Sequence, residues 1–159
     1  MKTENKITKN IIDFIETINE NLIDLASNKK EENKVSELHM HKILFIIYGG
    51  FYTKFKKELF EPNFEAWKYG PVEIDYRFLY KENINFKNKK NKFDFTFDNK
   101  TQIDYLEKLV KKLLKFSPWS LVDYTHSLEI WKENYNFENS KNPIYKKDIF
   151  QAFESINLS

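Results

Sequence analysis

The sequence predicts a mainly α protein, a single compact helical domain of about six or seven helices with a small antiparallel β-hairpin or sheet inserted mid-chain. Three observations favour this fold class. Apolar residues recur every three or four positions along most of the chain, which is the spacing of amphipathic helices. Two short stretches, 64–67 and 93–97, instead have the character of strands. A length of 159 residues suits one domain, and no repeat or linker divides 1–159.

Two helices are predicted in the first third of the chain. Residues 7–25 place apolar side chains on one face, with Asp, Glu, Lys and Asn opposite. Residues 38–55 are apolar on all sides over 43–48, which is typical of a central, buried helix, and Ser36 can cap its start. Gly49 and Gly50 inside this helix cost about 1 kcal/mol each relative to Ala. They indicate either close approach of another element or a break in the helix.

The segment 64–72, Phe-Glu-Ala-Trp-Lys-Tyr-Gly-Pro-Val, combines a strand with a sharp turn. Trp67 is predicted to be a buried apolar anchor. Gly70 and Pro71 are turn residues, and Pro71 suits the first position of a helix, so a helix is predicted over 72–80. We expect Trp67 and the turn to hold the small sheet against the helix 38–55.

The middle of the chain returns from strand to helix. Residues 81–92 are polar and lysine-rich, which predicts a mobile loop. Strict alternation over 93–97 predicts a half-buried strand, which could pair with 64–67. Helical spacing resumes over 101–115.

The last third of the chain is predicted to hold short helices. Ser117 and Pro118 begin one that continues through Val122. Thr125 and His126 end this helix or cap the next, near Ile130. A polar loop over 136–143 and a final amphipathic helix over 149–156 complete the chain.

Composition excludes several classes of function. The net charge is only +2, and every basic residue except Arg77 is lysine, whereas phosphate and guanine recognition favours arginine. Nucleic acid is therefore an unlikely partner. The absence of cysteine excludes disulfides and thiolate chemistry. No apolar run approaches the roughly 20 residues that span a bilayer, and the first residues are not a signal peptide, so a cytoplasmic protein without membrane contact is predicted.

No catalytic, cofactor or metal site is predicted. His39 and His41 are two residues apart, so on a helix they point in different directions. His126 is interpreted as a structural histidine packed near Trp131, because no nucleophile or paired carboxylate accompanies it. Three glycines are too few for a phosphate-binding loop. The protein is therefore not predicted to be an enzyme.

Two charged groups leave alternatives open. Glu65, Glu73 and Asp75 are interpreted as surface charge, or alternatively as an acidic rim for a basic partner. The lysines of 87–92 are interpreted as a solvated loop, or alternatively as phosphate contacts.

Three motifs together resemble a known family. They are Lys-Ile-Leu-Phe at 42–45, the segment 64–72, and Thr125-His126 followed by Trp131. This combination resembles the Panacea antitoxin domain, the SocA-like family also described as phage-associated GepA-like proteins. The chain departs from the family pattern at His41, Phe45 and Ile130, where the family usually has Gln, Tyr and Pro.

The resemblance implies an antitoxin of a toxin–antitoxin pair, which neutralises a co-encoded protein toxin by direct binding. An adaptor that delivers its toxin to a protease is the alternative, and a nucleic-acid-binding regulator is a second alternative. The resemblance implies no cofactor and no catalytic residue. The residues that match the family motif are expected to define the fold or to face the partner: Trp67, Gly70, Pro71, Val72, His126 and Trp131.

Overall fold

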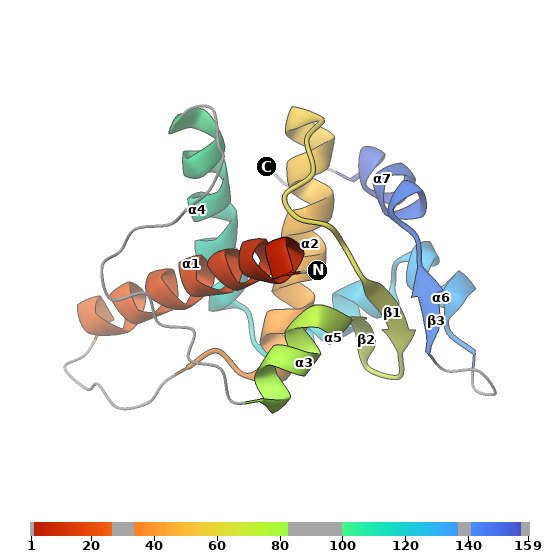
Figure 1. The fold of residues 1–159 in the computed structure, drawn as a ribbon, viewed down its shortest axis with the longest axis horizontal. Helices are drawn as coiled ribbons and strands as arrows, with labels where there is room; N and C mark the ends of the chain where they lie inside the picture. Colours follow the sequence, from red (N-terminus) through yellow and green to blue (C-terminus); the bar gives the residue numbers. More distant parts are fainter. Residues whose placement is uncertain (1, 27–33, 83–99, 137–140, 157–159) are drawn as a thin grey trace.

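The computed structural model describes residues 2–26, 34–82, 100–136 and 141–156, and these form seven helices and a three-stranded antiparallel sheet (Figure 1). The predicted fold class is confirmed. The helices are α1 (Lys2–Ala26), α2 (Glu37–Phe55), α3 (Ile74–Lys81), α4 (Lys100–Lys115), α5 (Pro118–His126), α6 (Glu129–Asn134) and α7 (Lys146–Glu154). The strands are β1 (Phe64–Trp67), β2 (Gly70–Glu73) and β3 (Asn142–Ile144).

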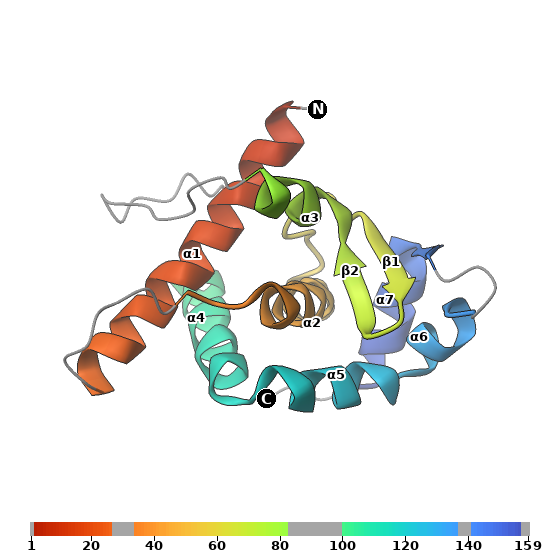
Figure 2. The ribbon, with the colours of Figure 1, turned by 90° about the horizontal axis from the view of Figure 1, so that it is seen from below.

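Helix α2 is the centre of the fold, as its continuous apolar run predicts. It contacts α3, α4, α5, α7 and β2, and Figure 2 shows it end-on with the other elements around it. Every residue from His39 to Phe51 is buried. Because a helix that is apolar on all sides has no face for solvent, the surrounding elements are arranged to cover it.

The ends and the glycines of α2 follow local chemistry. The Ser36 side chain accepts a hydrogen bond from the His39 N–H at 3.2 Å, which caps the first turn. Lys56 ends the helix in the left-handed conformation, with a φ of 58°. The helix continues through Gly49 and Gly50, so the predicted alternative of a break is wrong. At Gly49 the Phe153 ring of α7 lies where a side chain would be. Close approach of another element is thus the correct reading of this glycine.

The sheet has the strand order β2–β1–β3, with both neighbours antiparallel to β1. Strand β1 was expected and is confirmed. The helix predicted from residue 72 is wrong at its start, because Pro71 and Val72 lie in β2 and α3 begins at Ile74. Pairing of β2 with β1 outweighs the local preference of proline for a helix start.

The third strand comes from a different part of the chain than expected. β3 occupies Asn142–Ile144, at the end of a segment predicted to be polar loop, and Phe64 pairs with Ile144. The predicted strand 93–97 lies outside the described residues, as does most of the predicted loop 81–92. Three residues with one buried side chain are too short a pattern to identify a strand from sequence.

Candidate functional site

The hairpin between β1 and β2 presents a two-residue turn, Lys68 and Tyr69, which we call the hairpin turn. Trp67 pairs with Gly70, so only these two residues form the loop, and both are exposed. Gly70 follows with a φ of 108°, which residues with a side chain rarely adopt. The next residues of β2 are buried. The turn is therefore exposed at its tip and fixed at its base.

His126 and Trp131 hold the hairpin turn from the side. Trp131 donates its indole N–H to the Trp67 carbonyl oxygen at 2.9 Å, and His126 donates from Nε2 to the Lys68 carbonyl oxygen at 2.9 Å. The two rings stack at 4.0 Å between centroids. Since a carbonyl oxygen only accepts, His126 must carry its proton on Nε2. Side chains from α5 and α6 thus bind two consecutive carbonyls, one at the end of β1 and one in the turn.

Lys42 binds the backbone of the hairpin next to the turn, on its buried side. This side chain on α2 is fully buried and donates from Nζ to the Pro71 carbonyl oxygen at 3.0 Å. Burial lowers the pKa of the Lys42 amine to about 7, because the charged form loses its hydration. Buried Thr125 lies beside it, close to Gly70, and donates its hydroxyl to the Val122 carbonyl oxygen at 3.0 Å. The base of the turn is therefore a packed, hydrogen-bonded junction of α2, β2 and α5.

Trp67 does not anchor the sheet to α2, contrary to the sequence-based expectation. Strand β1 alternates, with Phe64 and Ala66 buried and Trp67 half-buried on the other face. The Trp67 indole N–H donates to Glu65 at 2.8 Å, and the Lys141 ammonium lies 4.4 Å from the ring centroid. Phe64 packs edge-on against Phe45 of α2 at 5.1 Å and is the anchor instead.

The replacement of Trp67 with alanine should lower the free energy of unfolding by about 1–2 kcal/mol, because a half-buried ring loses less contact than a buried one. Phe64→Ala is the matched control on the same strand, and its loss should be about 3–5 kcal/mol. Urea denaturation measures both values. Equal losses for the two variants would contradict this assignment of the inner and outer faces of β1.

A partly buried polar network lies between α2, β2 and α3. His41 donates from Nε2 to Glu37 at 3.0 Å and accepts the Glu73 backbone N–H at Nδ1. Arg77 also donates to Glu37, at 2.6 Å. The hydrogen bond from His41, together with Arg77, lowers the pKa of Glu37 to about 2, whereas burial lowers the pKa of His41. Because Nδ1 accepts a hydrogen bond, it carries no proton, and His41 links α2 to β2 as a neutral ring.

Glu73 is neither surface charge nor part of an acidic rim, so both interpretations are wrong for it. Its side chain is fully buried and accepts the Tyr76 N–H at 2.8 Å and the Asn63 N–H at 3.2 Å, which caps α3. Burial raises the pKa of Glu73 to about 8. Glu65 is half-buried against Trp67, and Asp75 accepts from the Asn63 side chain at 3.4 Å.

The histidines of the described segments have structural partners. Besides His41 and His126, His39 donates from Nε2 to the Leu113 carbonyl oxygen at 3.0 Å and joins α2 to α4. Within the described residues no three His, Asp or Glu side chains form a group that could bind a metal ion. Among the described helices, none is long and apolar enough to cross a membrane.

Next to the hairpin turn, two aromatic side chains from different elements are exposed. Tyr69 of the turn and Trp119 of α5 meet edge-to-face, with their ring centroids 5.3 Å apart, and are 47% and 55% exposed. Phe116, three residues before Trp119, is 46% exposed. We call Tyr69, Phe116 and Trp119 the aromatic patch. No local signal in the sequence identified it, because the contact joins residues 50 positions apart.

Residues 40–132 match the family model described as "Antitoxin SocA-like, Panacea domain". The match covers more than half of the chain and extends from α2 into α6. The chain belongs to this Panacea family. No curated protein and no solved structure gives a significant match. Membership supports an antitoxin role for the protein, and thereby a protein partner.

The residues expected from the sequence to match the family motif lie around the hairpin turn. Gly70, Pro71 and Val72 are the first three residues of β2, which is buried throughout, while His126 and Trp131 bind the carbonyls of Lys68 and Trp67. Their positions make the motif a junction between the hairpin and α5–α6. Two of the departures from the family pattern, Phe45 and Ile130, are buried apolar residues of the core, and the third, His41, belongs to the polar network.

Proposed function

We propose that this Panacea domain is a cytoplasmic antitoxin that neutralises a co-encoded protein toxin by direct binding, without catalysis. The observation that carries the proposal is the family match over residues 40–132. The aromatic patch beside the motif junction supplies a surface of the right chemistry. Tyrosine and tryptophan are enriched among the residues that dominate the binding energy of protein interfaces.

The junction supports this role through rigidity. Tyr69 lies directly after Trp67 and Lys68, whose carbonyl oxygens accept hydrogen bonds from Trp131 and His126. Trp119 lies in the first turn of α5, which Ser117 caps. Side chains on a fixed backbone lose little conformational entropy when they bind. The motif residues thus act by positioning the aromatic patch, and the patch contacts the toxin.

Co-expression with the neighbouring reading frame tests the proposed function. We expect that frame to arrest growth when expressed alone and to be harmless with this protein, and the two proteins should co-purify. If the toxin is instead lost from the cell while the antitoxin is present, the adaptor alternative is correct. A frame that is harmless alone, or that remains toxic in the presence of this protein, contradicts the proposal.

Tyr69→Ala and Trp119→Ala should each weaken toxin binding at least tenfold, since each removes a central aromatic anchor. Phe78→Ala is the matched control, because Phe78 is 62% exposed on α3, on the other side of α2 from α5 (Figure 2). Titration calorimetry with the purified toxin measures the three affinities. An equal effect of all three substitutions, or no effect of the first two, would show that the toxin does not bind the aromatic patch.

A further inference from the structure

Helix α4 carries a strip of lysines along its outer face. Lys108, Lys111, Lys112 and Lys115 follow at intervals of three and four residues, so they share one side of the helix, and all four are exposed. The opposite side, which includes Leu106, is buried against the core. The strip is thus a surface feature of one helix and forms no part of the core.

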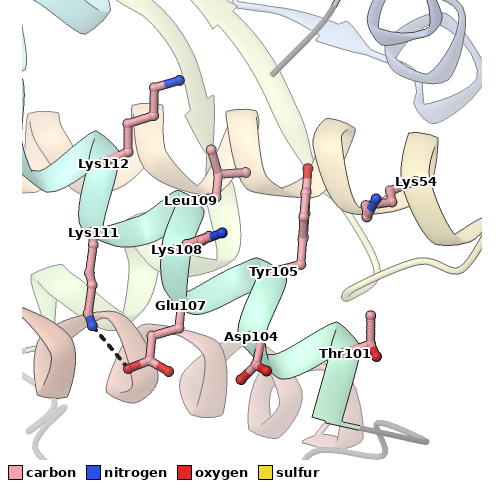
Figure 3. Close-up of a pocket in the computed structure, with 9 residues that line it drawn as sticks. All are labelled: Lys54, Thr101, Asp104, Tyr105, Glu107, Lys108, Leu109, Lys111 and Lys112. Atoms are coloured by element: carbon pink, nitrogen blue, oxygen red, sulfur yellow. Dashed lines mark ion pairs between the residues drawn. The ribbon is translucent and has the colours of Figure 1, made fainter. Parts of the chain in front are cut away.

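The lysine strip borders an open groove. Figure 3 shows Lys108, Lys111 and Lys112 along α4, with Tyr105 on the same helix between Lys108 and Lys54 of α2. The groove has a volume of about 860 Å³, and buried Leu109 and half-buried Tyr105 contribute apolar surface to its lining. A smaller hollow, lined by the same three lysines with Lys115 and Phe116, continues it toward the end of α4. We call both together the α4 groove.

Five lysines face two carboxylates in the α4 groove. Glu107 pairs with Lys111 at 3.3 Å, and Asp104 pairs with Lys100 at 3.2 Å. Across the segments that the structure describes, no carboxylate lies within ion-pairing distance of the remaining lysines of the groove, which are Lys54, Lys108, Lys112 and Lys115.

This arrangement works against the stability of α4. Lys108 and Lys112 are four residues apart, as are Lys111 and Lys115, and like charges at this spacing destabilise a helix by a few tenths of a kcal/mol per pair. The helix dipole favours Lys112 and Lys115 in the last turn of α4 and Lys54 in the last turn of α2, and the Lys54 ammonium also lies 5.8 Å from the ring centroids of Phe55 and Tyr105. The dipole does not explain Lys108, which lies before the last turn of α4. An anionic partner would offset the repulsion within the two lysine pairs of α4.

We propose that the α4 groove binds an acidic segment of the protein partner, one that also presents apolar side chains. Charge complementarity selects the acidic residues, and the surfaces of Tyr105, Leu109 and Phe116 select the apolar ones. A protein segment fits better than nucleic acid, because the groove has no arginine and its lining includes the apolar surfaces of Tyr105 and Leu109.

The groove ends three residues before Trp119 of the aromatic patch. Phe116 lines the end of the groove and is counted in the patch, and Trp119 is the second residue of the next helix, which begins at Pro118. A partner segment that extends from the end of α4 onto α5 would contact both surfaces. The identity of that partner as the toxin rests on the proposed function, whereas its acidic and apolar chemistry rests on the groove alone.

A fluorescein-labelled helical peptide tests this proposal on the isolated protein. The peptide carries Glu on one face and Leu on the adjacent face, and a matched peptide has Gln in place of Glu. We expect anisotropy to show binding of the Glu peptide that weakens steeply with salt, and at least tenfold weaker binding of the Gln peptide. Lys108→Glu with Lys112→Glu should weaken binding of the Glu peptide at least tenfold.

Lys81→Glu with Lys147→Glu is the control, because it changes the net charge equally at two exposed sites on α3 and α7. Equal weakening by both double variants would overturn the proposal, since it would show attraction to overall charge only. Equal binding of the two peptides, or no binding of either, would overturn it too. A 20-base-pair DNA duplex that binds more tightly than the peptide, and depends on the same lysines, would assign the groove to nucleic acid.

The outcome is independent of toxin neutralisation, because the peptide assay needs no toxin. Lys108→Gln with Lys112→Gln provides a second, charge-neutral variant, and a thermal midpoint close to that of the unmodified protein verifies that each variant is folded. Loss of peptide binding with unchanged neutralisation would refute the link between groove and toxin and leave the antitoxin role intact.

Discussion

Gly70→Ala should lower the free energy of unfolding by about 3 kcal/mol. Two costs combine at this position. The φ of 108° is unfavourable for any residue with a Cβ atom, by about 1–2 kcal/mol. An added Cβ would also lie 2.6 Å from Cε of Lys42 and 2.8 Å from the Thr125 hydroxyl oxygen, and overpacking of this kind costs about 1–3 kcal/mol. Urea denaturation at pH 7 measures the loss.

A double-mutant cycle with Thr125→Ala separates the two contributions. If steric overlap with Thr125 contributes, the double variant should be more stable than the sum of the two single losses predicts. If backbone strain dominates, the two losses should add. A Gly70→Ala variant whose stability is within 0.5 kcal/mol of the unmodified protein would refute the tight packing at the base of the hairpin turn.

Glu73→Ala is expected to be equally damaging, with a loss of about 3 kcal/mol. The substitution removes the acceptor for two backbone N–H groups, those of Asn63 and Tyr76, inside a fully buried site. A lost helix cap costs about 1 kcal/mol, and a buried donor without a partner costs about 1–3 kcal/mol. Asp75→Ala on the neighbouring, partly exposed position is the control and should change stability by less than about 0.5 kcal/mol. Similar losses for the two variants would contradict the role of Glu73.

The contribution of Glu73 should also depend on pH. Its pKa is raised from 4.5 to about 8 in the folded protein, so folding favours the neutral carboxyl. This stabilisation is complete below about pH 4.5 and is lost as the pH rises through 8. Glu73→Gln, which does not titrate, should therefore be least stable relative to the unmodified protein near pH 5 and should recover by about 2–4 kcal/mol near pH 9. A difference that is constant with pH would show that Glu73 is ionised when buried.

The helices were predictable because their signals are local. The apolar run of α2, the amphipathic spacing of α4 and the Ser117-Pro118 start of α5 each lie within one element. The strands were less predictable from local sequence. Pro71 has a local preference for a helix start, but its place in β2 is decided by pairing with Ala66, which no local pattern reports. Strand β3 exists only because β1 offers it an edge.

The candidate site also combines features that local sequence reports with contacts that it does not. The motif residues could be identified from sequence, yet the bonds that make them one unit join His126 to Lys68 and Trp131 to Trp67, across about 60 residues. The prediction that Trp67 is buried against α2 was wrong, because hydrophobicity alone does not report which side of a strand is buried. The pairing of Tyr69 with Trp119 depends on how α5 packs against the hairpin.

The contact between Gly49 and Phe153 has a consequence for synthesis of the protein. Helix α2 is complete about 100 residues before the ring that covers it is made, and β1 emerges long before β3. Synthesis proceeds at about 5–20 residues per second, so roughly 5–20 s separate the synthesis of α2 from that of Phe153. During this time the surface at Gly49 that Phe153 covers, and the edge of β1 that β3 covers, have no partner. Ribosome-bound chains that end before Phe153 therefore expose apolar surface that chaperones and proteases recognise. The nascent protein is most exposed to proteolysis in this interval, which ends when α7 packs against α2.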